Sequence, residues 1–162
     1  MKYFLCLLLL GCLVLGATGT AVAQGGPIQL ALFPPVQIVP ENESVTAFRF
    51  ALIYGVNANM TGFDWGLVTK STGSVLGVQW ALVGLVDQNF TGWQNTAVNI
   101  VGGSFEGLQM GWIYSSSSHV SGVQFGLINS TGSMKGFQLG LINLISEGGF
   151  MPIFPIVNWG GL

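Results

Sequence analysis

The chain has 162 residues, of which half are hydrophobic and only 6 % are charged, with a formal net charge of −2. Soluble domains carry charge on about a quarter of their residues, so we expect the hydrated surface to be built from Ser, Thr, Asn, Gln and Gly. Beyond residue 23 the only cations are Arg49, Lys70 and Lys135, which argues against nucleic-acid binding because no basic patch can neutralise phosphates.

Residues 1–23 have the layout of a secretory signal peptide. An apolar stretch over residues 3–15 follows one lysine, and small residues then lead to an expected cleavage before Gln24. A rival interpretation takes Cys12 as the acylated residue of a lipoprotein, but the apolar run continues past it. Cleavage before Gln24 removes Cys12 together with Cys6, so we expect an exported protein without disulfides.

Residues 24–46 are predicted to form N-terminal cap strands. Short apolar alternations between Pro27 and Pro40 are interrupted by prolines. Proline removes a hydrogen-bond donor from a strand ladder, so such strands suit the edge of a sheet.

Residues 47–149 repeat one motif with a period of fifteen residues. The motif is typified by GVQFGLI from Gly122, and a copy without the glycine starts at Ala47, which makes about seven units. The opening glycines are Gly62, Gly77, Gly92, Gly107 and Gly122, with Gly136 one residue early. Alternation with a period of two predicts a strand in each unit, and the Ser, Gly and Asn between units predict turns. The fold class is therefore an all-β repeat protein.

Residues 150–162 are predicted to form a C-terminal cap. The sequence MPIFPIVNWGGL again combines prolines with apolar residues, and we expect it to terminate the array in the same way as the N-terminal segment.

Two arrangements of the repeat are compatible with this pattern. In a β-solenoid the units stack in parallel and like positions lie side by side, so that Val75 neighbours Phe90. In an antiparallel β-meander the nearly palindromic motif places Val75 opposite Val98, and the strands could close into a small barrel. We favour the solenoid, because the apolar face of one unit is short for a strand that spans a membrane.

The alternation assigns the side chains of each unit to two faces. With the opening glycine as position zero, positions one, three and five are large and apolar, and we expect them to point inward. The apolar residue two before each glycine, for example Phe90 or Phe105, closes the core in this arrangement. Trp65, Trp80, Trp93 and Trp112 occupy these positions. We therefore expect them to be core residues and not a sugar-binding platform.

Position two is polar in all units that follow the pattern. Stacked Gln amides hydrogen-bond along a ladder and fix the register of the strands, which we prefer to a ligand-binding stripe. Arg49 and Asp64 occupy this position in adjacent units and are predicted to pair at the start of the ladder, with a ligand contact as the alternative. The predicted structural ladder comprises Arg49, Asp64, Gln79, Gln94, Gln109, Gln124 and Gln138.

No pattern in the sequence indicates a catalytic, cofactor or metal site. His119 is the only histidine and follows a run of serines, with no acid at a spacing that suggests an orienting partner. Asp87, Glu106 and Glu147 are scattered, one to a unit, and form neither a carboxylate pair nor a metal cluster. We therefore expect no enzymatic activity and no cofactor.

The units GVQFGLIN (residues 122–129) and GFQLGLIN (residues 136–143) resemble the GLQxGLxN repeats of bacterial, spirochaete-type surface-repeat proteins. The entry and exit segments of the repeat resemble that family as well. The resemblance implies an exported, envelope-associated repeat protein and no catalytic residues. The pattern is broken at Asn95 and Thr96, which replace an apolar residue and a glycine.

Together these observations predict a non-enzymatic protein of the cell envelope, at the outer membrane or surface or in the periplasm, with a structural or adhesive role and unknown partners. The alternative is a small outer-membrane β-barrel or pore component, which the low charge and the palindromic motif favour.

Overall fold

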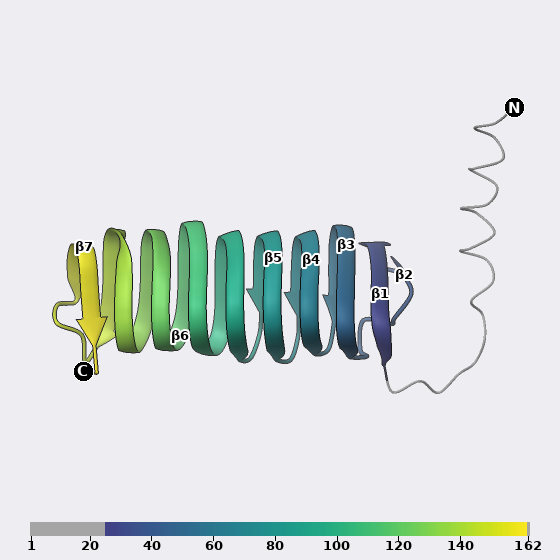
Figure 1. Cartoon of the computed structure of the whole chain (residues 1–162), viewed down its shortest axis with the longest axis horizontal. Coiled ribbons are helices and arrows are strands. Elements are labelled where there is room, and N and C mark those ends of the chain that lie inside the picture. Colours follow the sequence, from purple (N-terminus) through teal and green to yellow (C-terminus); the bar gives the residue numbers. More distant parts are fainter. Residues whose placement is uncertain (1–24, 162) are drawn as a thin grey trace, which may run out of the picture.

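The computed structural model describes residues 25–161, and every regular element in this range is a β-strand (Figure 1). The expected signal peptide and the alternative lipoprotein site at Cys12 lie outside the described residues. Within the described range, no helix has the length and apolar character needed to cross a membrane. The strands are β1 (Gly26–Phe33), β2 (Val36–Gln37), β3 (Val45–Asn57), β4 (Met60–Ser71), β5 (Val75–Val86), β6 (Phe90–Glu147) and β7 (Ile153–Gly160).

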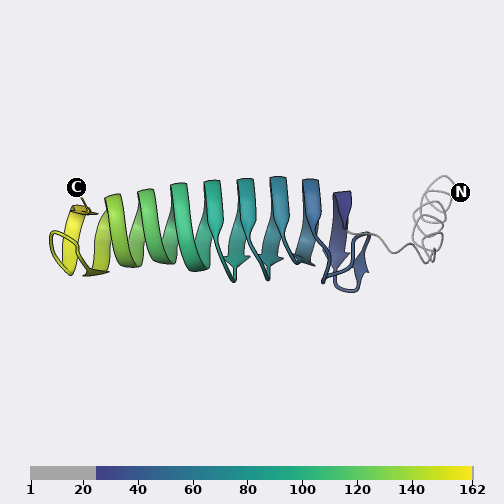
Figure 2. The same cartoon turned by 90° about the horizontal axis from the view of Figure 1, so that it is seen from below.

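The repeat units form a β-solenoid, as favoured from the sequence. Strands β3, β4, β5 and the start of β6 pair in parallel, and paired residues are fifteen positions apart, except that the spacing falls to fourteen from Tyr54 to Asn57 of β3 after a register shift. Val75 therefore pairs with Phe90, whereas Val98 pairs with Val83. This register excludes the antiparallel meander, in which Val75 faces Val98. Strand β6 continues from coil to coil without interruption (Figure 1, and from below in Figure 2).

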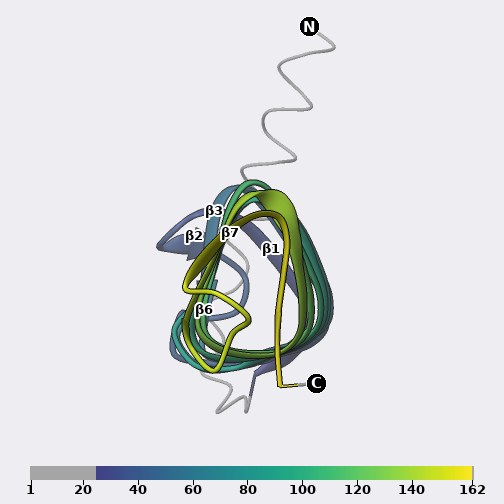
Figure 3. The same ribbon diagram turned by 90° about the vertical axis from the view of Figure 1, so that its left-hand side faces the viewer.

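Each coil is a closed loop with rounded corners when the solenoid is viewed along its axis (Figure 3). The opening glycine of each unit has a positive φ angle, such as +131° at Gly92. A Cβ atom at Gly92 would lie 2.0 Å from the carbonyl oxygen of Gly77 in the preceding coil. Both the backbone conformation and the close approach require glycine, and this explains the fifteen-residue spacing of the glycines.

One apolar row runs along the interior of the solenoid. It contains the residue two before each glycine, as expected from the sequence, and Phe90 and Phe105 stack there with their ring centroids 5.3 Å apart. Its buried members in successive units are Met60, Val75, Phe90, Phe105, Val120 and Met134. Like residues stacked on like residues fill the interior continuously and stabilise the coils against one another.

The expected orientation of positions one, three and five is wrong. Gln124, at position two, is fully buried, whereas Phe125 and Leu127 on either side of position four are exposed. The inward side of this strand combines a Gln at position two, which hydrogen-bonds to the Gln of the preceding coil, with a glycine at position four, where a Cβ atom at Gly126 would lie within 3 Å of the Gly111 backbone. The large apolar side chains therefore point outward, and the polar position two points inward.

The two ends of the solenoid are closed by different strand pairings. At the N-terminal end, β1 pairs in parallel with β3 and antiparallel with the two-residue strand β2. At the C-terminal end, β7 pairs antiparallel with the last part of β6, so the chain reverses there. Strand β7 contains Pro155, which suits a strand whose outer edge has no partner strand among the described residues.

Candidate functional site

The residues predicted to form a ladder lie in one row inside the solenoid, and all of them are fully buried. Each Gln donates from Nε2 to the side-chain oxygen of the preceding unit. Gln94 donates to Gln79 over 2.7 Å, Gln109 to Gln94 over 2.8 Å and Gln138 to Gln124 over 2.8 Å. All amides thus point the same way, so that their dipoles add along the axis.

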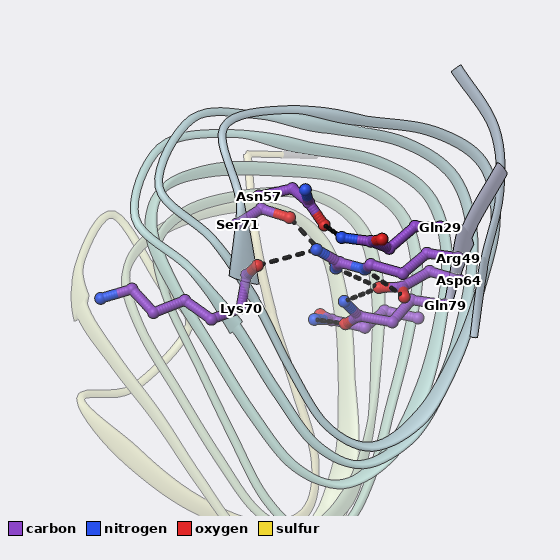
Figure 4. A network of polar contacts seen from close by, with 8 residues as sticks. Gln29, Arg49, Asn57, Asp64, Lys70, Ser71 and Gln79 are labelled. Carbon is purple, nitrogen blue, oxygen red and sulfur yellow. Dashed lines mark hydrogen bonds and ion pairs between the residues drawn. The ribbon is translucent and has the colours of Figure 1, made fainter. Parts of the chain in front are cut away.

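Arg49 and Asp64 form a bidentate ion pair at the start of this row (Figure 4). Arg49 Nε lies 2.7 Å from Asp64 Oδ1, and Arg49 Nη2 lies 2.6 Å from Asp64 Oδ2. Arg49 also donates to the backbone oxygen of Lys70 and to the hydroxyl of Ser71. The buried guanidinium is therefore surrounded by acceptors, as a charge without water must be.

Asp64 determines the direction of the whole ladder. An ionised carboxylate only accepts hydrogen bonds, so Gln79 must turn its Nε2 toward Asp64 Oδ2, at 2.8 Å. The Oε1 atom of Gln79 is then directed at the next coil, where only a donor fits. The same constraint repeats to Gln138, whose Oε1 atom is buried without a hydrogen-bond partner among residues 25–161.

A second polar row faces the ladder from the return side of the coils, by which we mean the part of each unit between position six and the next opening glycine. Asn129 donates to Asn143 Oδ1 over 2.9 Å, and Asn57 accepts from Gln29 Nε2 over 3.2 Å. These residues are also fully buried. The polar side chains inside the solenoid thus hydrogen-bond mainly to one another. The Gln row is a structural ladder, and because it is buried it offers no surface to a ligand.

The outer surface carries the apolar residues that were expected in the core. Trp112 is 60 % exposed and Trp80 is 50 % exposed. We define the apolar face as the exposed large apolar residues at positions one, three, five and six. They are Leu52, Ile53, Trp65, Leu67, Trp80, Leu82, Trp93, Leu108, Trp112, Ile113, Phe125, Leu127, Phe137, Leu139, Leu141 and Ile142.

The apolar face extends over the length of the solenoid. Ile28 and Leu30 of β1 lie in register with Phe48 and Phe50 of β3, and both β1 residues are exposed. At the other end, Trp159 of β7 lies beside Phe137. The broken unit interrupts the face only locally, since Asn95 is buried and accepts a hydrogen bond from Trp112 Nε1 at 3.0 Å.

The charged side chains outside the ladder avoid the four positions of the apolar face. Lys70 and Asp87 form a partly exposed ion pair on the return side, with Nζ and Oδ2 3.2 Å apart. Glu106 and Lys135 each precede an opening glycine and flank the apolar face. The solenoid is therefore amphipathic around its axis, with an uncharged apolar face and a polar return side.

His119 lies at a shallow, open hollow of about 310 Å³ that Glu106, Lys135 and three serines also line. In the described part of the chain no hydrogen bond or ion pair joins His119 to these residues, and no group of three or more His, Cys, Asp or Glu residues is placed to hold a metal ion. Nothing there orients the imidazole toward a nucleophile, which general-base catalysis requires.

Sequence reasoning missed the apolar face because it assigned the most hydrophobic positions to the interior. The signal that could have corrected it is position four, where Gly66, Gly111 and Gly126 share a strand face with the Gln row. A Cβ atom at Gly66 or Gly126 would lie within 3 Å of the backbone of the preceding coil, and one at Gly111 would meet Tyr114 and Ser115 of its own coil, so position four faces a crowded side of the strand.

Comparison with known proteins adds no relative to this picture. No protein-family model matches the chain, and neither curated proteins nor solved structures give a match. The resemblance to spirochaete-type surface repeats therefore stays a prediction.

Proposed function

We propose that this chain is an exported, non-enzymatic repeat protein of the cell envelope, whose solenoid is a scaffold for an adhesive apolar face. The observation that carries the proposal is the inversion of the coil: paired polar rows lie inside, and large apolar side chains lie outside over the length of the solenoid. An apolar surface of this kind requires a partner, since water solvates it poorly.

The extent of the face supports a binding role. The apolar face has sixteen residues. If roughly half of a side chain of about 150–200 Å² is exposed at each residue, the face offers about 1,200–1,600 Å² of apolar surface. The largest apolar patch of a typical monomeric protein measures about 300–600 Å² and is often functional. The face is therefore much larger than incidental exposure explains.

A non-enzymatic role agrees with where the reactive groups lie. The Arg49–Asp64 pair is fully buried and fully engaged, so it cannot meet a substrate. We do not propose the outer-membrane barrel, because that alternative assumed antiparallel strands and the coils pair in parallel.

Envelope fractionation of a Gram-negative host that expresses the full chain tests this proposal. We compare the double variant Leu82→Ser with Leu127→Ser on the apolar face against Thr72→Ser with Gln88→Ser on the exposed return side. We expect the unchanged chain and the return-side variant to sediment with the envelope, and the apolar-face variant to move to the soluble fraction. Equal sedimentation of both variants, or a soluble unchanged chain, would contradict an adhesive role of the face.

A further inference from the structure

The apolar face is convex, because it continues around a corner of the coil. Consecutive residues of a regular strand point to opposite sides, yet positions five and six are both exposed. Leu52 and Ile53 are 50 % and 49 % exposed, and Leu141 and Ile142 are 66 % and 43 % exposed. The chain therefore turns at positions five and six, and the face covers two sides of the solenoid that meet at this corner.

This shape restricts what can cover the face. Obligate dimer interfaces reach roughly 1,000–2,500 Å² on each partner, so the shape of the face, and not its area, decides between a second copy and another partner. A second solenoid packed flat on one side of the corner leaves the other side in water. A fluid layer of acyl chains adapts to both sides at once, so the shape favours lipid over a second copy.

The charge distribution matches the same occupant. Positions one, three, five and six carry no charged residue in the described units, so an uncharged surface meets an uncharged hydrocarbon layer. Lys70 and Asp87 lie on the return side, where they stay in water when the apolar face is covered. This is the division of polarity that places amphipathic elements in a membrane interface.

The backbone also permits contact with hydrocarbon. A backbone group that loses water without a hydrogen-bond partner costs several kcal/mol in a bilayer core. The strands from β1 to β6 that carry the apolar face have paired neighbours on both sides in the sheet. From β3 to β6 the peptide groups are engaged between coils, so only side chains need to enter the lipid there; the outer edge of β1 is paired only in part, by the two-residue strand β2.

We infer that the apolar face docks on a lipid layer, with the solenoid axis along the membrane plane and the return side in water. This inference rests on the proposed adhesive function and names its partner. Trp65, Trp80, Trp93 and Trp112 then lie at the boundary of headgroups and acyl chains, where amphipathic indole rings are stabilised.

Tryptophan quenching by brominated lipids tests the inference on the full chain. All five Trp residues follow residue 24, so their emission reports on the solenoid and not on the apolar N-terminal stretch. With neutral phosphatidylcholine vesicles we expect a blue shift of the emission. We also expect a loss of intensity when bromine is placed on the acyl chains near the carbonyl end. A folded protein whose emission is unchanged by brominated vesicles would overturn the inference.

Charged substitutions identify the surface that enters the lipid. We expect Leu82→Lys with Leu127→Lys to lose the quenching, whereas Thr72→Lys with Gln88→Lys on the return side keeps it, both variants retaining the far-ultraviolet circular dichroism of the parent. If the emission is shielded from aqueous quenchers but not quenched by brominated lipid, and the protein sediments as a dimer, the occupant is a second copy. A chain that sediments with the envelope in the fractionation above but is not quenched by brominated lipid overturns the lipid partner and keeps the adhesive role, so the two proposals fail separately.

Discussion

Asp64 is the residue that gives the interior of the solenoid its order. As an acceptor on both oxygens it takes the bidentate fork of Arg49 and the amide of Gln79, at 2.8 Å. Every later amide follows the direction set by this contact. The ion pair thus fixes the register of the coils and the direction of the amides in the ladder. A continuous Gln ladder would replace its contribution to stability.

The first prediction concerns the ion pair. Asp64→Gln alone leaves the buried Arg49 charge unpaired, and we expect a loss of about 3–5 kcal/mol in the free energy of unfolding. The double variant Arg49→Gln with Asp64→Gln extends the ladder by two amides, and we expect it to recover most of that loss. Urea unfolding followed by circular dichroism measures both. A double variant as unstable as the single one would contradict the claim that added Gln residues can replace the ion pair in the ladder.

The second prediction concerns the glycine row. Gly92→Ala places a Cβ atom 2.0 Å from a backbone oxygen at a φ angle of +131°, so we expect a loss of more than about 4 kcal/mol or failure to fold. Gly148→Ala is the matched control, because its φ is also positive, at +70°, but no atom lies within 4 Å of the added Cβ. We expect the control to cost about 1–2 kcal/mol. Thermal unfolding measures the stability of both variants. Similar losses of stability in the two would show that the close approach of neighbouring coils at Gly92 plays no part.

At the scale of the element, one coil is held by its neighbours. Equivalent residues of neighbouring coils pair in parallel over most of a unit, and the interior rows of Gln and of apolar residues stack in the same register. A slip by one residue would exchange the buried Gln row with the exposed apolar residues. The two interior rows and the glycines therefore specify a single register together.

The third prediction tests this register by cross-linking. Neighbouring parallel strands lie about 4.8 Å apart, which is within the range of Cα separations for a disulfide. In a background of Cys6→Ser and Cys12→Ser, we expect Val75→Cys with Phe90→Cys to oxidise. We expect Val75→Cys with Val98→Cys to stay reduced. Mobility on non-reducing gels distinguishes them, and oxidation of the second pair alone would contradict a parallel stack.

The repeat unit, the strand, the parallel stack and the members of the ladder could be predicted from the sequence, because periodicity reports directly on neighbouring residues. The side of the strand that faces inward could not. Alternation separates Gln124 from Phe125 but does not say which lies inside, and burial of apolar residues was the wrong guide here. The hydrogen bonds between Gln amides at position two and the close approach of Gly126 to Gly111 at position four decide it, and both exist only after the coils have stacked.

At the scale of the whole molecule, the inverted coil yields an amphipathic rod. Its interior is stabilised by hydrogen bonds, by the apolar row and by further buried apolar residues such as Val86, Val101 and Ile145, and its apolar face stays exposed. Low overall charge limits the solubility of an isolated protein, and it agrees with the proposal that lipid covers two sides of this one.

The fourth prediction follows from the absence of charge on the apolar face. Screening by salt weakens interactions between exposed charges but not the burial of apolar surface. We expect high concentrations of sodium chloride to leave the protein on phosphatidylcholine vesicles, as judged by flotation, and a non-ionic detergent to release it. Release by salt alone would point to an electrostatic contact through Lys70 or Lys135 instead.

The inverted orientation is the central claim, and maleimide labelling of adjacent positions tests it most directly. In the background of Cys6→Ser and Cys12→Ser, the account predicts that Phe125→Cys reacts rapidly in the folded protein, whereas Gln124→Cys reacts only after denaturation. Rapid labelling of Gln124→Cys together with protection of Phe125→Cys would contradict it, since the apolar residues would then form the core.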